Sequence, residues 1–285
     1  MGNYRKILVA FDGSESGKNA LKQALMLAEL EKSWIKVLAV VPAYEGDLEL
    51  VGVSEIEKVL KGPRDKLIAM AQEAARAEGV EVIADVQQGE PYETIVDVGE
   101  EESCDLIVMG RRGLRRLERM LMGSVTARVI GHSAKDVLVV PRNATFALDN
   151  ILLATDGSAH SEAALERALH FASVCGGRLT AVSVVDVYPE FYAEAPEIVE
   201  KMEKKSLDII DGVAEKAKAA GVKADTRVLR GNSAEEIVDL SQEIRAGAIF
   251  MGSRGRSGLS KLVMGSVAEK VIGLASCPVL VAKPS

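Results

Sequence analysis

One glycine-rich pattern occurs twice in this chain of 285 residues, and it constrains the fold more than any other feature. The pattern is G-x2-G-x9-G-S, and its copies are Gly110, Gly113, Gly123 and Ser124 in the first half and Gly252, Gly255, Gly265 and Ser266 in the second. Each copy follows a short apolar run and leads into a helical pattern, which is the order of strand, loop and helix in phosphate-binding sites. Because glycine lets the backbone approach an anion closely, the pattern predicts a phosphate site in each half.

The serine that ends each pattern has two possible roles. Ser124 and Ser266 stand where helices are expected to begin, just before Val125 and Val267. Each hydroxyl either caps its own helix or reaches a phosphate oxygen beside the unpaired N–H groups of the helix start. The sequence leaves both roles open.

A second repeat extends the duplication to the whole chain. Residues 7–14 (ILVAFDGS) match residues 151–158 (ILLATDGS), an offset of 144 residues from 7 to 151, whereas the glycine patterns are offset by 142 residues, from 110 to 252. The difference of two residues is assigned to the poorly matching segments 45–62 and 189–204. We therefore predict two tandem domains, residues 1–142 and 149–285, joined by a linker over residues 143–148.

Short apolar strands alternate with helices in each half. For the first half we predict strands at Ile7–Phe11, Val37–Val41, Val80–Val86, Leu106–Met109 and Val137–Val140. Ser14 is expected to cap the first helix, Gly79 to end the long helix, and Pro91 to start the next one. In the second half, Ser233-Ala234-Glu235-Glu236 is expected to form a capping box. The alternation predicts one doubly wound, five-stranded parallel sheet of the Rossmann-like kind in each half.

Ligands of such sheets bind outside the carboxyl ends of the strands, where the strand order reverses. Asp12 and Asp156 end the first strands, and the glycine patterns follow the fourth strands. If the first and fourth strands are neighbours, these residues face one crevice. Asp-Gly is also a common turn pair, so a purely structural role for the two aspartates stays open.

The order of elements, the Asp-Gly-Ser after the first strand and the glycine pattern together resemble the universal stress protein family in its tandem two-domain form. The resemblance covers essentially the whole chain, once per half. It implies an adenine-nucleotide alpha hydrolase-like fold with the halves related by a pseudo-twofold axis and, from the ATP-binding branch of the family, loops that hold the ribose and phosphates of ATP. The implied nucleotide-binding residues are Asp12, Val40, Gly110, Arg112, Gly113, Gly123, Ser124 and Val125, and Asp156, Val184, Gly252, Arg254, Gly255, Gly265, Ser266 and Val267.

Two details of this set remain open. Val40 and Val184 are implied to face the adenine, through backbone groups, but valine is also an ordinary core residue of a buried strand. The loops differ in charge, since the first carries Arg111, Arg112, Arg115, Arg116 and Arg119 and the second carries Ser253, Arg254, Arg256 and Lys261. Arg112 and Arg254 correspond and are the better candidates for phosphate contact, whereas most of the others fit a solvated basic loop.

Two classes of function follow from these patterns. The resemblance implies a regulator that binds one ATP per half, with Mg²⁺ or Mn²⁺ held through the phosphates, and hydrolyses it slowly or not at all. The alternative is an enzyme such as a slow ATPase, and a sensor of AMP or a cyclic nucleotide is a further one. Against the enzyme, the duplicated positions offer no histidine, lysine or glutamate as a general base, and the pattern G-x-x-x-x-G-K-[ST] is missing. We therefore predict no catalytic residue.

Charge and composition narrow the partners. The net charge of −7 argues against a general surface for nucleic acid or anionic membrane, and no apolar run approaches the length of a membrane span. The sequence at the N-terminus lacks the apolar stretch of a signal peptide, so a cytoplasmic location is expected. Cys104, Cys175 and Cys277 form no metal-ligand spacing with the histidines, so no metal site made by protein side chains is expected.

Two expectations concern assembly. The apolar strands Val137–Val140 and Val279–Val281 follow the last helix of each half, and we predict that the halves pack about the pseudo-twofold axis through them. The acidic segments Tyr44–Lys61 and Tyr188–Lys204 differ between the halves and are expected to determine contact with an unidentified protein partner. A homodimer remains open.

Overall fold

The computed structural model describes residues 4–41, 53–113, 122–186, 194–255 and 264–284, with only the helical backbone for residues 53–61. Two compact units divide the chain. The first contains residues 1–135 and 140–143, and the second contains residues 136–139 and 144–285. Each unit has its own set of parallel strands and helices.

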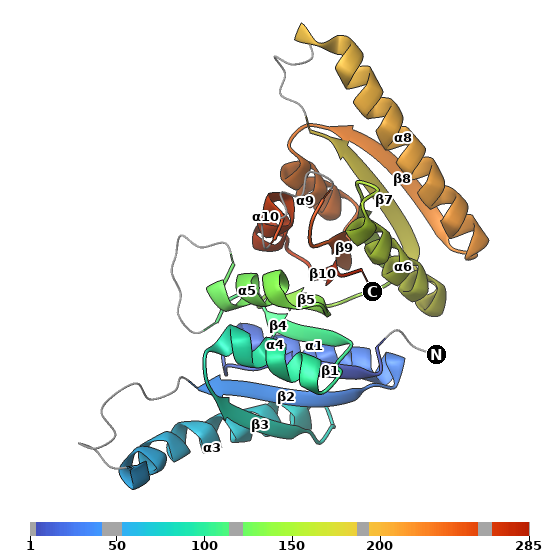
Figure 1. Ribbon diagram of the computed structural model, residues 1–285. Coiled ribbons are helices and arrows are strands. Elements are labelled where there is room, and N and C mark those ends of the chain that lie inside the picture. The colour runs from blue at the N-terminus through green and yellow to red at the C-terminus, as the bar shows by residue number, and fades with distance from the viewer. Residues whose placement is uncertain (1–3, 42–52, 114–121, 187–193, 256–263, 285) are drawn as a thin grey trace. The chain divides into compact units, whose positions relative to one another are not determined.

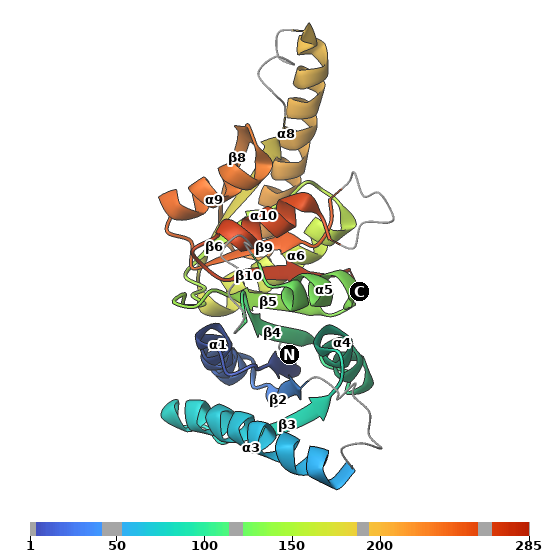
Figure 2. The ribbon, with the colours of Figure 1, turned by 90° about the vertical axis from the view of Figure 1, so that its left-hand side faces the viewer.

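The first unit is a parallel sheet covered by helices on both faces (Figures 1 and 2). Its elements are β1 (Lys6–Ala10), α1 (Glu15–Glu31), β2 (Trp34–Val41), α3 (Val53–Ala77), β3 (Ile83–Gln88), α4 (Pro91–Glu101), β4 (Leu106–Gly110) and α5 (Ser124–His132). The strand order is β3-β2-β1-β4, and neighbouring strands are parallel. Helix α1 packs against α3 and helix α4 against α5, with α1 and α4 on opposite faces of the sheet (Figure 2).

The second unit repeats this plan. Its elements are β5 (Asp136–Val140), β6 (Asn150–Ala154), α6 (Ala159–Cys175), β7 (Arg178–Val185), α8 (Pro196–Ala219), β8 (Lys223–Arg230), α9 (Ser233–Glu243), β9 (Ala248–Gly252), α10 (Ser266–Leu274) and β10 (Val279–Ala282). The strand order is β5-β10-β9-β6-β7-β8, and all neighbours are parallel except β5 and β10.

Strand β5 pairs with β10 in antiparallel register. Leu138 faces Leu280, and Val139 faces Val279. The sequence predicts apolar strands at these two places, and their pairing is present within the second unit. The pseudo-twofold relation of the halves stays a prediction.

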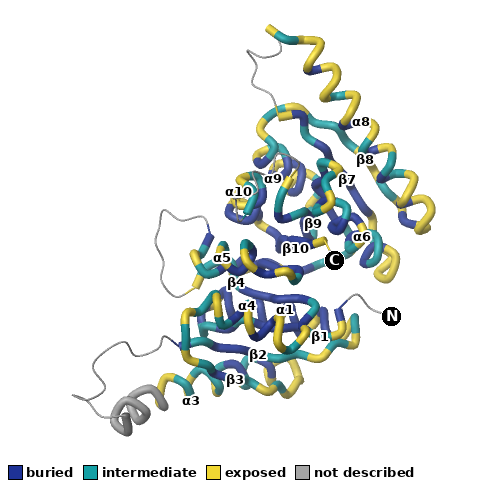
Figure 3. Tube along the Cα trace, in the orientation of Figure 1, coloured by how far each residue is buried: buried dark blue, intermediate teal, exposed yellow. Residues whose placement is uncertain are grey.

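The central strands form the core of each unit (Figure 3). Residues 7–9 of β1 and 106–108 of β4 are fully buried and apolar, as are residues 151–153 of β6 and 248–250 of β9. Continuous apolar runs are typical of parallel strands with helices on both faces. Each fully buried side chain of this kind contributes about 1.5–3 kcal/mol relative to an exposed one. The rings of Phe146, Phe171 and Phe250 also pack together in the second unit, with centroids 5.9–6.4 Å apart.

The predicted helix caps are correct in one place and displaced in another. Ser14 caps α1, because its Oγ accepts the Gly17 N–H at 3.0 Å. The expected capping box at Ser233 is wrong, since the N-cap of α9 is Asn232, whose Oδ1 accepts the N–H groups of Ala234 and Glu235. The backbone of Asn232 is extended, which is the conformation that an N-cap needs, and Ser233 is therefore the first helical residue.

The two acidic segments lie partly outside the described residues. Of Tyr188–Lys204, residues 196–204 form the start of α8, and of Tyr44–Lys61, residues 53–61 are described only as helical backbone. No helix in the described ranges combines the length and apolarity needed to cross a membrane.

Candidate functional site

In the first unit, strands β1 and β4 bring Asp12 and the glycine loop to one edge of the sheet. The two strands are parallel neighbours, with Ala10 opposite Met109. Asp12 follows the end of β1, and its Oδ1 accepts the Ser14 N–H at 3.0 Å, as in a turn. A Cβ added to Gly113 would lie 2.6 Å from Asp12 Oδ2, so the loop passes close to this carboxylate only because residue 113 has no side chain.

The second unit repeats this geometry. Strands β6 and β9 pair with Ala154 opposite Met251. The Oδ1 of Asp156 accepts the Ser158 N–H at 3.0 Å, and a Cβ on Gly255 would lie 2.8 Å from Asp156 Oδ2. The aspartates therefore act in the turns, as their Asp-Gly sequence allows, and also line the edge where the loops lie.

Each loop closes on itself through one hydrogen bond. Gly123 N–H donates to the Arg111 carbonyl at 2.9 Å, and Gly265 N–H donates to the Ser253 carbonyl at 2.9 Å. Both glycines are N-caps, and neither helix has a side-chain cap. A capping role for Ser124 and Ser266 is therefore wrong, because both are the first residues of their helices. The N–H groups at the starts of α5 and α10 have no capping side chain and suit an anion.

The end of β2 extends beyond β1 and presents its backbone there. The register of the pair ends at Ala10 and Leu38, and the Phe11 N–H still donates to the Leu38 carbonyl at 2.8 Å. In a parallel sheet, successive residues direct their N–H and C=O groups to alternate neighbours. The carbonyl of Val41 accepts the Gly89 N–H at 3.1 Å, so the N–H and C=O of Val40 face the opposite side, past the end of β1.

Strand β7 does the same in the second unit. Its pairing with β6 ends at Ala154 and Val182, and the Thr155 N–H donates to the Val182 carbonyl at 2.9 Å. The Val185 carbonyl accepts the Gly231 N–H at 3.2 Å on the β8 side. The backbone N–H and C=O of Val184 therefore face the space beyond β6, next to the carboxyl edge that holds Asp156.

A cavity of about 400 Å³ occupies this edge of the second unit. The predicted residues that line it are Asp156, Val184, Gly252, Arg254, Gly255, Gly265, Ser266 and Val267. Ser253 also lines it, is fully buried, and its Oγ has no hydrogen-bond partner among the described residues. A buried hydroxyl without a partner is costly, so this atom fits a ligand that offers an acceptor or a donor.

The arginines of the first loop are only partly described. Arg111 is half-buried, and its burial, followed by the charge of Arg112, lowers the pKa of its guanidinium. In the second loop the Arg254 carbonyl accepts a hydrogen bond from Ser158 Oγ at 3.4 Å, which ties the loop to the start of α6. The basic residues Arg115, Arg116, Arg119, Arg256 and Lys261 lie outside the described residues.

Two cationic or titratable residues near the second loop do not follow from the repeated pattern. A Cβ on Gly252 would lie 2.7 Å from the Cβ of His160. Burial lowers the pKa of His160, and the charges of Lys283 and Arg254 lower it further. Lys283 is 7% exposed, and burial together with Arg254 lowers its pKa to about 8.

The first half has other residues at these two positions. Ser16 corresponds to His160, and Pro141 corresponds to Lys283. Ser16 is uncharged and donates its Oγ proton to the Val140 carbonyl at 3.1 Å. His160 and Lys283 therefore have no counterparts of the same type in the first half, and this difference between the halves is the sequence feature that could have pointed to them.

Comparisons with known proteins agree with this architecture. A model of the universal stress protein family matches residues 3–141 and again residues 147–283. Universal stress protein Sll1388 of Synechocystis sp. is 36% identical over 151 residues, which are 48% of this chain and 97% of that protein. A universal stress protein of Mycolicibacterium smegmatis is 28% identical over 210 residues, 72% of this chain and 70% of its own length.

A solved structure agrees with the fold over the full length. The crystal structure of a universal stress protein from Archaeoglobus fulgidus has a TM-score of 0.74, with 100% of both chains covered, at 22% identity. Because the family model matches both halves, the chain belongs to the universal stress protein family, with one family domain in each half.

Proposed function

We propose that each half of the chain binds one adenine nucleotide, ATP with Mg²⁺ or Mn²⁺, and that the protein is a regulator that hydrolyses it slowly or not at all. The observation that supports this proposal is that both halves repeat one arrangement at the carboxyl edge of the strands. In each, a strand-end aspartate abuts the second glycine of the loop, and a valine presents free backbone beyond the neighbouring strand.

The backbone groups of Val40 and Val184 suit an adenine base. Adenine carries a ring-nitrogen acceptor beside an amino donor, and the N–H and C=O of one extended residue offer the complementary pair. In the second unit the cavity wall here also includes the apolar side chains of Val182 and Ile237, which suit the faces of a base. Side-chain substitutions at either valine are therefore expected to have little effect on base recognition.

The glycine loops suit the phosphates. The uncapped starts of α5 and α10 combine N–H donors with the positive end of the helix dipole. In the second half the buried Ser253 Oγ gains an acceptor when a phosphate or ribose oxygen lies in the cavity. Arg254 lines the same cavity and offers a charge for a phosphate. Magnesium would be bound chiefly by phosphate oxygens and water.

A regulatory role fits these residues better than catalysis. Among the predicted positions, the polar side chains that both halves share are one serine, one arginine and one aspartate per half. Each aspartate already accepts a hydrogen bond from its own turn, from Ser14 N–H or Ser158 N–H, which holds it in a structural role. Nucleotide occupancy would then act by changing conformation or the choice of a protein partner.

Calorimetric titration of nucleotide-free protein with ATP, ADP, AMP and cyclic AMP tests the proposal. We expect two ATP sites in the unmodified chain and weaker binding after removal of divalent cations. Gly123→Val should eliminate the first site and Gly265→Val the second, because each side chain blocks approach to a helix start. A Cβ at either position meets only ordinary contacts, the nearest at 3.4 Å, so Gly123→Ala and Gly265→Ala are controls for folding. Gly212→Ala, in open space on α8, should leave both sites intact.

Two results would contradict the proposal. A stoichiometry of one in protein freed of nucleotide would exclude the two-site model. Rapid hydrolysis of ATP in the unmodified protein that is lost in Asp12→Ala or Asp156→Ala would favour the ATPase alternative. An aspartate with a purely structural role in its turn would not be required for turnover. Tighter binding of AMP or cyclic AMP than of ATP would favour the sensor.

A further inference from the structure

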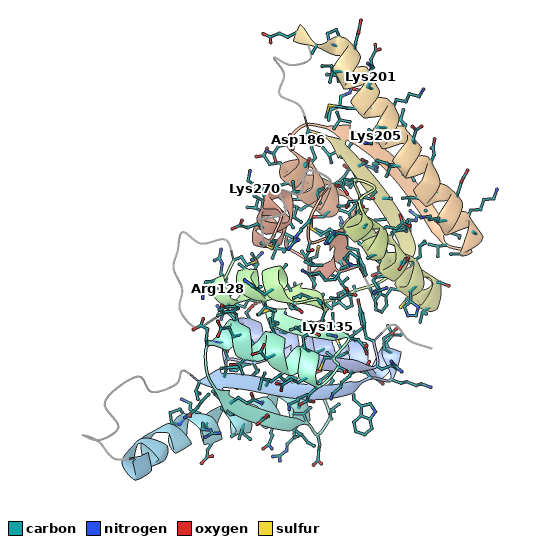
Figure 4. All side chains as sticks on the ribbon, viewed as in Figure 1. Arg128, Lys135, Asp186, Lys201, Lys205 and Lys270 are labelled. Atoms are coloured by element: carbon teal, nitrogen blue, oxygen red, sulfur yellow. The ribbon has the colours of Figure 1, made fainter. Side chains whose placement is uncertain are left out.

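The lining of the cavity in the second unit includes a carboxylate besides that of Asp156. Asp186 follows directly after β7, two residues beyond Val184 (Figure 4). It lines the cavity together with Ser233 and Met202. Residues two apart along an extended chain face the same side, so Asp186 continues the row begun by Val184. Both residues line the same cavity, so a base bound against Val184 would share that cavity with this carboxylate.

The carboxylate of Asp186 is exposed, accepts one backbone hydrogen bond and retains acceptor capacity. Its Oδ2 accepts the Ser233 N–H at the start of α9, at 3.3 Å. An ionised carboxylate has two oxygens with about four lone-pair sites and no donor. Ser233 N–H uses one of these, so the group favours a ligand atom that donates a hydrogen bond and disfavours one that accepts it.

The first half lacks this acceptor. Alignment of Val40-Val41-Pro42 with Val184-Val185-Asp186 places Pro42 at the position of Asp186. Alignment of Gly89-Glu90-Pro91 with Gly231-Asn232-Ser233 likewise places Pro91 at the position of Ser233. Proline has no side-chain acceptor, so position 42 cannot supply the carboxylate that position 186 supplies.

We propose that Asp186 determines base specificity at the second site by accepting a hydrogen bond from the exocyclic amino group of adenine. This inference rests on the proposed nucleotide site. The amino group has two N–H bonds, one for the Val184 carbonyl and one for Asp186. The second site then depends on the amino group more strongly than the first, where the residues that the structure describes offer the Val40 carbonyl and no carboxylate at the position of Asp186.

Competition between ATP and purine riboside triphosphate, which lacks the amino group, tests the inference. The second site is measured alone in Gly123→Val, and the first site alone in Gly265→Val. A hydrogen bond to a charged group has a net effect of about 10- to 100-fold in affinity. We therefore expect the preference for ATP over the analogue to be at least about 10-fold larger at the second site. Asp186→Ala in the Gly123→Val background should reduce that preference to the value of the first site.

Matched variants separate recognition from folding. Asp186→Asn retains an oxygen acceptor for the Ser233 N–H but loses the charge, so it should keep the α9 start intact and lower the preference part of the way. Asp225→Ala, an exposed carboxylate on β8 of the same unit, should leave the preference unchanged.

The outcomes distinguish this inference from the proposed function. An equal preference at the two sites, or one that Asp186→Ala does not change, overturns the inference while ATP binding stands. Tighter binding of GTP than of ATP at the second site, lost in Asp186→Ala, also overturns it, since the carboxylate would then read the N1 and N2 donors of guanine. If neither site binds ATP, the proposed function fails and this inference fails with it.

Discussion

Replacement of Asp136 by alanine should destabilise the second unit strongly. Asp136 is 4% exposed and lies at the start of β5. Its Oδ2 accepts the Nε–H of Arg167 at 2.9 Å, and its Oδ1 accepts the backbone N–H of Lys283 at 2.8 Å. One side chain thus connects strand β5, helix α6 and the residue that follows β10.

The magnitude follows from what the substitution leaves behind. Removal of one partner from a buried ion pair typically costs about 3–5 kcal/mol, because the remaining charge stays buried without its partner. Arg167 is 19% exposed, and its other carboxylate contact, to Glu166, is longer, at 3.7 Å. The free energy of unfolding should therefore fall by about 3–5 kcal/mol in Asp136→Ala. With an m-value near 3 kcal/mol/M in urea, this moves the midpoint by at least about 1 M.

Urea unfolding followed by far-ultraviolet circular dichroism measures this shift. The matched control is Asp225→Ala, which removes an ion pair to Arg178 whose two side chains are 64% and 65% exposed and 3.9 Å apart. Exposed pairs contribute about 0–1 kcal/mol, so the control midpoint should hardly move. The double variant Asp136→Leu with Arg167→Met should recover much of the lost stability, since it leaves no unpaired charge. Equal midpoints for Asp136→Ala and the control would refute the reasoning.

Two further predictions test other parts of the second unit. A Cβ at Gly247 would lie 2.5 Å from the Ala147 carbonyl oxygen, so Gly247→Ala should lower the melting temperature. Gly212 lies in open space on helix α8, so Gly212→Ala should raise the free energy of unfolding by about 0.5–1 kcal/mol. Calorimetric melting temperatures that shift in the same direction for both variants would contradict this prediction. Burial lowers the pKa of Lys283 to about 8; the charge of Arg254 lowers it further, and the charge of Asp136 opposes the shift. The charge of Lys283 in turn lowers the pKa of His160. Lys283 therefore binds its proton more tightly in the unfolded chain than in the folded one. Its charged form destabilises the fold below about pH 8, and the free energy of unfolding rises as this penalty is lost between pH 8 and 10.5. Lys283→Met should stabilise the protein at pH 7 by up to about 3 kcal/mol and progressively less above pH 8, and a stability difference that is independent of pH would refute the assignment.

The elements were predictable where hydrophobic periodicity and turn residues agree. All five strand positions predicted for the first half contain a strand, since short apolar runs between helical patterns are hard to place otherwise. The third strand begins later than predicted, at Ile83. The reason is local, because the Val80 N–H donates to the Ala75 carbonyl at 3.1 Å across Gly79, whose φ is +77°. Val80 thus completes the end of helix α3 before the strand starts.

The helix starts show a limit of side-chain reasoning. Serine is a preferred N-cap, so Ser124, Ser266 and Ser233 all invite that assignment. In each case the residue before the serine has the extended conformation and is the cap, and two of those residues are glycines without a side chain to offer. The backbone conformation decided the boundary, and it depends on the loop that leads into the helix.

The crevice itself follows from the sequence because it is made largely of backbone. A loop that must pass within contact of Asp12 or Asp156 needs glycine at 113 and 255, and that need is visible in both copies. The residues that distinguish the two halves at this edge of the strands are side chains that occur once. Asp186 and Lys283 have only Pro42 and Pro141 as counterparts, so no repeat draws attention to them.

The position of Lys283 shows why the three-dimensional structure was needed to identify such residues. Lys283 follows β10, and Arg254 follows β9, 29 residues earlier from 254 to 283. The two strands are parallel neighbours with Ala282 opposite Gly252, so both cations emerge at the same edge of the sheet. Burial lowers the pKa of Lys283, and repulsion from the half-buried Arg254 lowers it further. An anion bound beside Arg254 would relieve this repulsion and raise the pKa of Lys283. Binding of a phosphate to the second unit at pH 8 should therefore be accompanied by uptake of up to about half a proton, while the first unit, with Pro141 at this position, should show none.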